Sequence, residues 1–156
     1  MCNLNSNKLY ILGIFYVVGY IFYMCLGWNE TPEQKPFLKL LNNQIFFIHF
    51  IIHVILGGFG VALAYKGYFQ YVFLLAPTLF LLLLRLLDPI VVKLTRRHLY
   101  FVGKGDSYPK DYRWYLDAPI AVLLGTIPLC TCGYLMNFFR FGTFMCLSLG
   151  GFFIGL

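Results

Sequence analysis

The sequence predicts an all-α protein, a polytopic transmembrane bundle of four to five helices with one amphipathic segment at the membrane interface. Of its 156 residues, 60% are hydrophobic and only 12% are charged, against about 25% charged residues in an ordinary soluble domain. Apolar runs of about 20 residues recur along the chain, which is the length that crosses the roughly 30 Å hydrocarbon core of a bilayer. Short polar connections separate them. This composition excludes a soluble enzyme, a disordered chain and a disulfide-built secreted domain.

The first three predicted spans cover residues 9–28, 45–65 and 69–87. Aromatic residues lie at both ends of the first span, as is typical of the membrane–water interface. The connection between the second and third spans has only three residues, so these spans should form an antiparallel hairpin of neighbouring helices. Pro77 interrupts the third span, which a membrane helix tolerates where neighbouring groups satisfy the freed carbonyl.

The polar connection, residues 88–117, is the longest one in the chain. Within it, residues 90–101 alternate apolar pairs with basic residues, which predicts a short amphipathic helix lying in the interface. Asp117 is the expected N-cap of the next helix.

A fourth span is expected over residues 118–136, followed by a turn at residues 137–140. The last apolar run, residues 141–156, is at the short end for a span and could cross a thinned bilayer or be re-entrant. Four spans and five spans therefore both stay open. The whole chain, residues 1–156, forms a single integral membrane domain under either count.

The formal net charge of +6 comes from an uneven distribution of basic residues. Nine of the twelve Lys and Arg residues lie in residues 29–44 and 85–117, whereas Lys8, Lys66 and Arg140 fall elsewhere. The positive-inside rule places the nine in the cytoplasm, with the amino terminus outside. We expect a bacterial or organellar inner membrane, with anionic lipid headgroups rather than nucleic acid as the partners of these charges.

Two histidines, His49 and His53, lie four residues apart in the second predicted span. At this spacing both imidazoles share one helix face. They could hydrogen-bond to a neighbouring helix, form part of a proton or ion pathway, or contribute to a metal or haem site. A zinc site needs at least three protein ligands, and only one other histidine exists in the chain. No cofactor is therefore expected, and metal or haem at these histidines is the weakest of the three readings.

Arg85 and Asp88 close the third predicted span and can pair on one helical face. The hairpin brings spans two and three together, which places Arg85, Asp88, His49 and His53 in one half of the bundle. These four residues form a predicted polar intramembrane cluster, for transport or for structure. The simpler alternative is that Arg85 extends toward the interface and Asp88 caps the helix end.

Small residues in the second span predict a helix-packing surface, because they let helices approach closely in lipid. The partner helix could belong to this chain, to another copy or to another subunit. The residues are Gly57, Gly58, Gly60 and Ala62.

Aromatic and basic residues in the polar connection predict an interfacial belt or a surface that docks a partner. A solvated loop is the alternative. The residues are Arg96, Arg97, Tyr108, Tyr112, Arg113, Trp114 and Tyr115.

No catalytic set of residues is apparent, so the leading hypothesis is a non-enzymatic membrane protein that acts through helix packing. It would be a subunit of a membrane assembly, a homo-oligomer, or an immunity-type protein that neutralises a pore-forming toxin. The alternative is an ion- or proton-conducting subunit that uses the predicted polar cluster, and a haem- or metal-dependent redox protein is a third. The layout of short-looped spans is common to several unrelated classes and does not choose among them.

Overall fold

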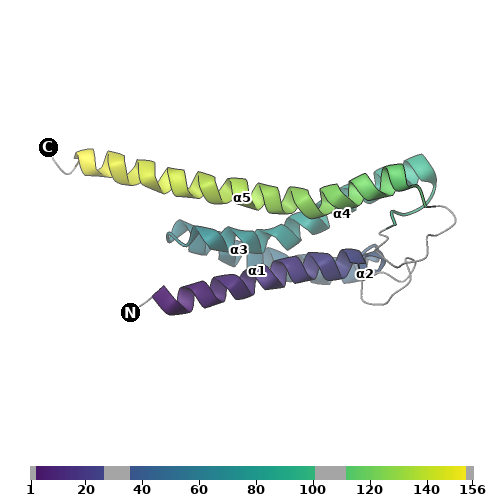
Figure 1. Cartoon of the computed structure of the whole chain (residues 1–156), viewed down its shortest axis with the longest axis horizontal. Coiled ribbons are helices and arrows are strands. Elements are labelled where there is room, and N and C mark those ends of the chain that lie inside the picture. Colours follow the sequence, from purple (N-terminus) through teal and green to yellow (C-terminus); the bar gives the residue numbers. More distant parts are fainter. Residues whose placement is uncertain (1–2, 27–35, 101–111, 154–156) are drawn as a thin grey trace.

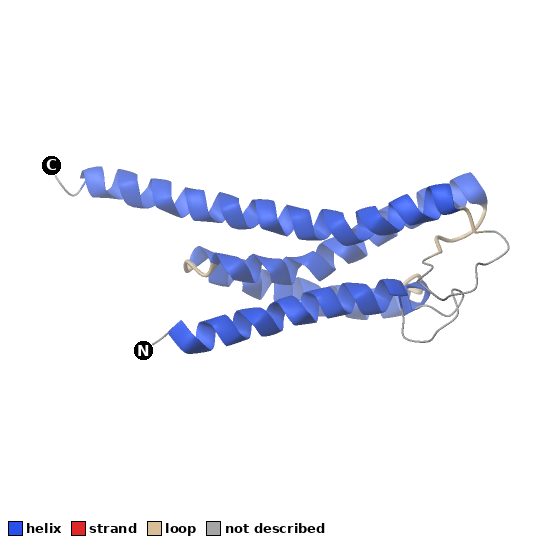
Figure 2. Cartoon of the chain, viewed as in Figure 1, coloured by secondary structure: helices blue, strands red, loops and turns tan. Residues whose placement is uncertain are grey.

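In the part of the chain that the structure describes, the long helical segments form four passes, which run back and forth along one long axis (Figure 1). The computed structural model of the protein describes residues 3–26, 36–100 and 112–153. The described residues contain helices and connecting loops but no strand (Figure 2), which confirms the predicted all-α class. The elements in chain order are α1 (Asn3–Leu26), α2 (Pro36–Lys39), α3 (Asn43–Tyr65), the 3-10 helix η2 (Phe69–Leu75), α4 (Ala76–Thr95) and α5 (Trp114–Phe153).

Three segments of the described chain are long and apolar enough to cross a membrane, which is compatible with an integral membrane protein. They are Asn43–Tyr65, Phe69–Thr95 and Trp114–Phe141. Over the residues whose side chains the structure describes, α1 adds the apolar stretch Tyr10–Cys25. The structure therefore supports transmembrane helices as a class.

The predicted hairpin between the second and third spans is present, and its turn depends on one glycine. Asn42 begins α3 as its N-cap, and its side-chain oxygen accepts a hydrogen bond from the Gln44 amide at 2.9 Å. At the other end Gly67 has a φ of 94°, a left-handed conformation that only glycine adopts without steric cost. The amides of Gly67 and Tyr68 donate to carbonyls of the last turn of α3, each at 3.0 Å, which terminates the helix.

The third pass is the central element of the bundle. It begins as η2, which contacts α1, α3 and α5, and it continues as α4. In this pass 44% of the most apolar window is buried, against 22% in α3 and 17% in the fourth pass. Its core residues pack against all three neighbours, so the other helices are arranged around it. The largest of its fully buried side chains are Val72, Phe80, Leu81, Leu84 and Val91.

Both prolines of the third pass have a different effect from the one expected. Pro77 lies in the first turn of α4, directly after η2, where its missing amide is not needed by the helix. Pro89 lies inside α4, so the span does not end at residue 87 as predicted. Residues 90–95, expected in a separate interfacial helix, continue α4 to its end at Thr95. The C-cap residue, Arg96, has a left-handed φ of 60°. Burial of Val91 against the core explains the continuation.

The last pass, α5, corrects the expected end of the chain. It is one helix of 40 residues from Trp114 to Phe153, so the predicted turn at residues 137–140 is absent. At 1.5 Å per residue α5 is about 60 Å long, and it extends beyond the other passes (Figure 1). The start of α1 and the end of α5 lie at the same end of the bundle as the turn between α3 and η2, opposite the start of α5 (Figures 1 and 2).

Candidate functional site

Two histidines of α3 face two tyrosines of α1, and these four residues are called the Tyr–His cluster here. Tyr16 and Tyr20 lie four residues apart on α1, as His49 and His53 do on α3. Because the two helices are antiparallel, Tyr16 lies opposite His53 and Tyr20 lies opposite His49. The Tyr16 hydroxyl is 3.0 Å from His53 Nε2, and the Tyr20 hydroxyl is 3.2 Å from His49 Nδ1.

The hydrogen bonds of His53 define its tautomer. Its Nδ1 lies 2.6 Å from the backbone carbonyl oxygen of His49. A carbonyl only accepts, so Nδ1 carries a proton and donates it. In the neutral ring Nε2 is then an acceptor, and Tyr16 is its donor. Both ring nitrogens of His53 are thus used within the bundle, at a side chain that is only 2% exposed.

Ring packing adds to these hydrogen bonds. The Tyr20 ring lies 4.3 Å from the His53 ring and, in a T-shaped contact, 6.5 Å from the Phe80 ring of α4, both measured between ring centroids. Such aromatic contacts contribute beyond the area they bury. The Tyr–His cluster therefore joins α1 to α3 and rests on the central pass.

The arrangement of the two imidazoles is unfavourable for chelating a metal ion. Their rings are nearly parallel, with an interplanar angle of 9° and centroids 6.1 Å apart. Both imidazoles would need a free nitrogen about 2.0–2.1 Å from one ion, and both ring nitrogens of His53 already bond, one to Tyr16 and one to a carbonyl. Within the described ranges no group of three or more His, Cys, Asp or Glu side chains is placed to hold a metal.

Arg85 lies apart from the histidines and holds the start of α3. Its guanidinium donates to Asn43 Oδ1 at 2.5 Å and to the Leu41 carbonyl at 3.5 Å. It also lies over the ring of Phe46, 5.5 Å from the centroid. Arg85 therefore connects α4 to residues more than 40 positions earlier, and the predicted pairing partner Asp88 has other contacts.

Asp88 is buried and binds the chain that leaves α4. Its carboxylate accepts a hydrogen bond from His98 Nδ1 at 2.9 Å and from the Leu99 amide at 3.4 Å. Only 9% of the Asp88 side chain is exposed, against 56% for His98. Asp88 thus fixes the backbone just after the left-handed turn at Arg96.

A second buried acid, Asp117, binds Arg97 with both carboxylate oxygens. The Arg97 guanidinium is 2.7 Å and 3.1 Å from the two oxygens, and the Arg113 amide donates to the same carboxylate at 2.9 Å. Asp117 is fully buried and Arg97 is 12% exposed. The Arg97 guanidinium also lies 4.9 Å from the centre of the Tyr100 ring. We call the pairs Asp88–His98 and Arg97–Asp117 the connection clasp, because they close the link between α4 and α5.

The connection clasp was not recognised from the sequence, although a signal for it exists. Asp88 and Asp117 are the two acidic residues that adjoin long apolar segments. A carboxylate in such a position needs a cation or several donors, and Arg96, Arg97 and His98 follow within ten residues of Asp88. Asp117, predicted as an N-cap, lies instead in the first turn of α5, because the helix begins at Trp114.

The small residues of α3 divide between two faces. A Cβ on Gly60 would collide with the Tyr71 carbonyl, and one on Gly57 would lie 2.9 Å from a methyl of Leu75. Both glycines therefore allow η2 to pack closely on α3. Gly58 has open space where a Cβ would be, and Ala62 is exposed on the same outer face.

The predicted docking residues are dispersed around the connection. Arg96, Arg113, Trp114 and Tyr115 are exposed, whereas Arg97 is committed to Asp117. Tyr112 is half-buried beside the start of α5. Tyr108 lies outside the described residues.

Comparison of the chain with protein-family models, with curated proteins and with solved structures found no match. Its function is therefore inferred from its own residues and their geometry.

Proposed function

We propose that the protein is a non-enzymatic integral membrane protein that acts through helix–helix contacts, as a subunit or packing partner in a membrane assembly. The observation that carries this proposal is the contrast between its interior and its outer faces. The polar side chains of the predicted cluster each have a partner within the chain. The outer face of α3, in contrast, is apolar and uncovered, and its exposed large residues include Phe47, Ile48, Ile51, Ile52, Ile55 and Phe59.

The outer face of α3 also supports the idea of a protein partner. Gly58 and Ala62, four residues apart, lie on this face, and small residues at this spacing let a second helix approach closely in lipid. The inner glycines, Gly57 and Gly60, are already used by η2. Gly58 is therefore the position at which the proposed contact with another chain is best probed.

The alternative of a proton or ion conductor has less support in the geometry. A relay needs groups that accept a proton and pass it on, but His53 donates to a backbone carbonyl, which cannot pass it further. Arg85 and Asp88 belong to contacts separate from the Tyr–His cluster. The four residues of the predicted polar cluster thus serve three different connections between elements.

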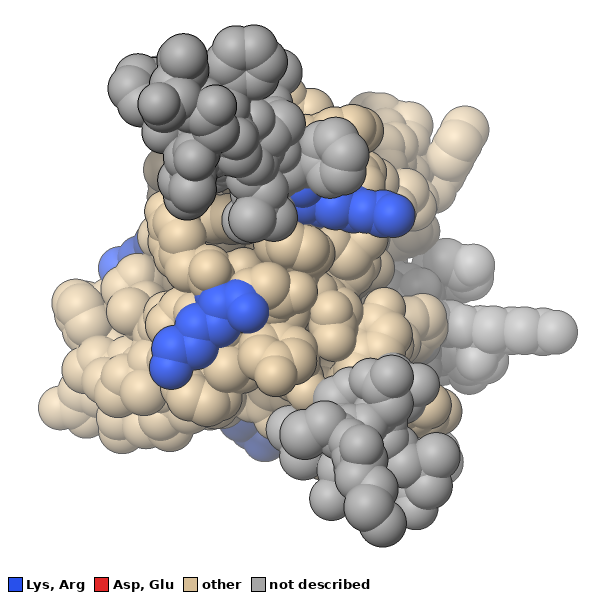
Figure 3. All heavy atoms as spheres, turned by 90° about the vertical axis from the view of Figure 1, so that its left-hand side faces the viewer, with Lys and Arg blue, Asp and Glu red and all other residues tan. Residues whose placement is uncertain are grey.

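For the orientation in the membrane, we propose four passes with the connection clasp on the cytoplasmic side. Among the basic residues within the described ranges, Lys39, Arg85, Lys93, Arg96, Arg97 and Arg113 lie toward that end. At the opposite end, the described part of the surface shows separate basic side chains among uncharged ones (Figure 3). The positive-inside rule then places both termini outside, which differs from the five-span arrangement only for the carboxyl terminus.

The assembly proposal is tested by comparing Gly58→Leu with Gly19→Leu. Both glycines are exposed and have open space for a side chain, so neither variant should disturb the fold. We expect the wild-type protein to leave the membrane in mild detergent with copies of itself or with other chains, and Gly58→Leu to lose them while Gly19→Leu keeps them. Native mass spectrometry and cross-linking in intact membranes identify the chains that are bound to the wild type and to each variant. A monomer in both measurements would contradict the proposal.

A flux assay in liposomes separates the conducting alternative. We expect proton and cation leak equal to that of lipid alone. Flux from wild-type protein that disappears in the double variant His49→Ala, His53→Ala would support a conductor instead.

A further inference from the structure

A cavity of about 360 Å³ lies between α1 and the first half of α5, and it belongs to neither the Tyr–His cluster nor the outer face of α3. We propose that it binds the acyl chain of an anionic phospholipid, whose headgroup lies at the basic end of the bundle. The proposal rests on the membrane location proposed above. The volume is in the range of ligand sites in proteins.

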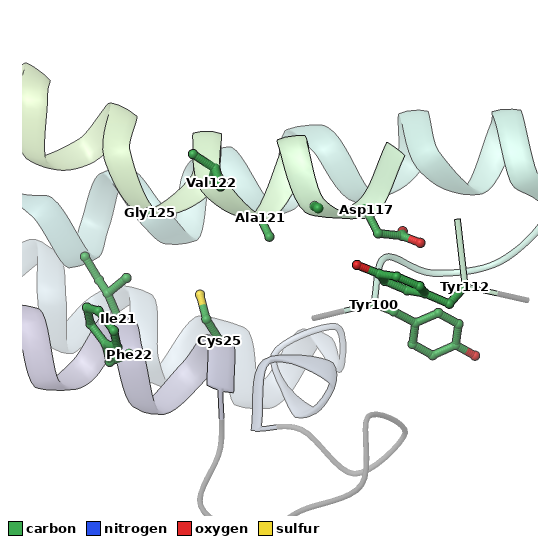
Figure 4. Close-up of a pocket in the computed structure, with 10 residues that line it drawn as sticks. Ile21, Phe22, Cys25, Tyr100, Tyr112, Asp117, Ala121, Val122 and Gly125 are labelled. Carbon is green, nitrogen blue, oxygen red and sulfur yellow. The ribbon is translucent and has the colours of Figure 1, made fainter. Parts of the chain in front are cut away.

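The walls of the cavity are apolar along most of its length. Ile21, Phe22 and Cys25 of α1 form one wall, and Val122 and Gly125 of α5 face them (Figure 4). Phe22 and Val122 are both more than half exposed, at 58% and 61%, so the rim of the cavity lies at the outer surface of the bundle. In a bilayer this opening faces lipid, and an acyl chain can enter from the side.

The cavity becomes polar at one end. Tyr100, Tyr112 and Asp117 line it there, while Ile21 and Gly125 lie at the other end (Figure 4). Asp117 adds no free negative charge, because Arg97 holds both of its carboxylate oxygens. The gradient from apolar to polar along one cavity matches an amphiphile rather than a uniformly apolar ligand.

The charge at the polar end favours an anionic headgroup. Arg113 directly follows Tyr112 and is exposed, and Arg96 is exposed in the same connection. The acids described there, Asp88 and Asp117, already bind His98 and Arg97. Basic residues between helices on the cytoplasmic side are a recurrent site for anionic lipids.

The first experiment fills the cavity. The protein is placed in nanodiscs of equal phosphatidylglycerol and phosphatidylcholine, released into mild detergent and examined by native mass spectrometry. We expect one retained phosphatidylglycerol per chain in the wild type and none in Gly125→Leu, whose new side chain would occupy the cavity. Gly133→Leu on the same helix is the matched control, because its Cβ also meets open space and Gly133 does not line the cavity.

A second filling variant, Ala118→Leu, guards against a folding defect of the first, since Ala118 lines the cavity and is exposed. Loss of the lipid in both filling variants and its retention in Gly133→Leu would support the proposal. Retention of the lipid in a folded Gly125→Leu or Ala118→Leu protein, or loss in all three variants, would overturn it.

The headgroup is tested by Arg113→Gln. One Lys or Arg near an anionic surface changes binding about fivefold, so we expect the preference for phosphatidylglycerol over phosphatidylcholine to fall by about that factor. An unchanged preference, or equal retention of both lipids by the wild type, would overturn the assignment to an anionic lipid. Failure of the proposed membrane location would appear earlier, as a protein that alkaline carbonate extracts from membranes, whereas a membrane-embedded protein that retains no lipid would contradict the cavity proposal alone.

Discussion

His53 and Tyr16 are hydrogen-bonded across two helices, with the tyrosine hydroxyl 3.0 Å from the imidazole Nε2. The histidine is almost fully buried, and its other ring nitrogen donates to its own helix. This contact ties α1 to α3.

We therefore expect Tyr16→Phe to destabilise the fold. The substitution removes the donor to a buried acceptor, which costs about 0.5–1.5 kcal/mol, although interhelical hydrogen bonds in membranes average about 0.6 kcal/mol. The free energy of unfolding in mixed micelles measures the effect. Tyr23→Phe is the control, since Tyr23 is an exposed tyrosine of the same helix. Equal losses in the two variants would mean that the hydrogen bond to His53 contributes nothing.

Replacing glycines on the two faces of α3 should have opposite effects. Gly60→Ala places a methyl group against the Tyr71 carbonyl and should destabilise by about 1–3 kcal/mol, as overpacking does. Gly58→Ala meets open space and should stabilise by up to about 1 kcal/mol, because alanine is the better helix former. Thermal unfolding of both variants checks the difference. A neutral Gly60→Ala would show that η2 does not pack on α3 as described.

Removing Arg97 should be the most damaging of the charge substitutions. Arg97→Gln leaves the buried Asp117 carboxylate without its cation, at a cost of about 3–5 kcal/mol. Arg113→Gln, at an exposed position, should change stability by no more than about 0.5 kcal/mol. Denaturant titration compares the two.

The double variant Arg97→Met, Asp117→Leu tests whether the unpaired charge accounts for the stability lost in Arg97→Gln. It removes both charges, so it should recover most of the stability lost in Arg97→Gln, because a buried ion pair replaced by apolar residues is often neutral. A double variant as unstable as Arg97→Gln would mean that the clasp acts through more than the charge pair.

The positions of the chain ends are a further prediction. With four antiparallel passes, a reporter after residue 156 and one inserted at Gly67 should report the same side of the membrane. A reporter within residues 101–111 should report the opposite side. A reporter at residue 156 on the same side as the connection would favour five spans.

The sequence was sufficient for the helical class and for the hairpin, because the length and the apolarity of a segment are local properties. The helix-packing role of Gly57, Gly58, Gly60 and Ala62 stays a prediction. The sequence was insufficient for two helix ends. The third span was expected to end at residue 87 and a turn was expected at residues 137–140, but α4 and α5 continue through these positions. At Pro89, tertiary burial of Val91 overrides the local signal.

The contacts of a side chain were harder to predict than its position along a helix. Tyr16 and Tyr20 show the same four-residue spacing as His49 and His53, but only the antiparallel pairing of α1 with α3 reveals that the pairs meet. The grouping of Arg85 with the histidines followed from the hairpin alone, and the structure gives Arg85 a different neighbour, Asn43.

The positions of these contacts along the chain also set an order for biosynthesis. Every residue of the Tyr–His cluster is made within the first 53 positions, so α1 and α3 can pair while the rest of the chain is still on the ribosome, as early folding from the amino terminus allows. Asp117 is made 20 residues after Arg97, so Arg97 is already part of the chain when Asp117 is added. The buried carboxylate of α5 is therefore never present in the growing chain without its cation.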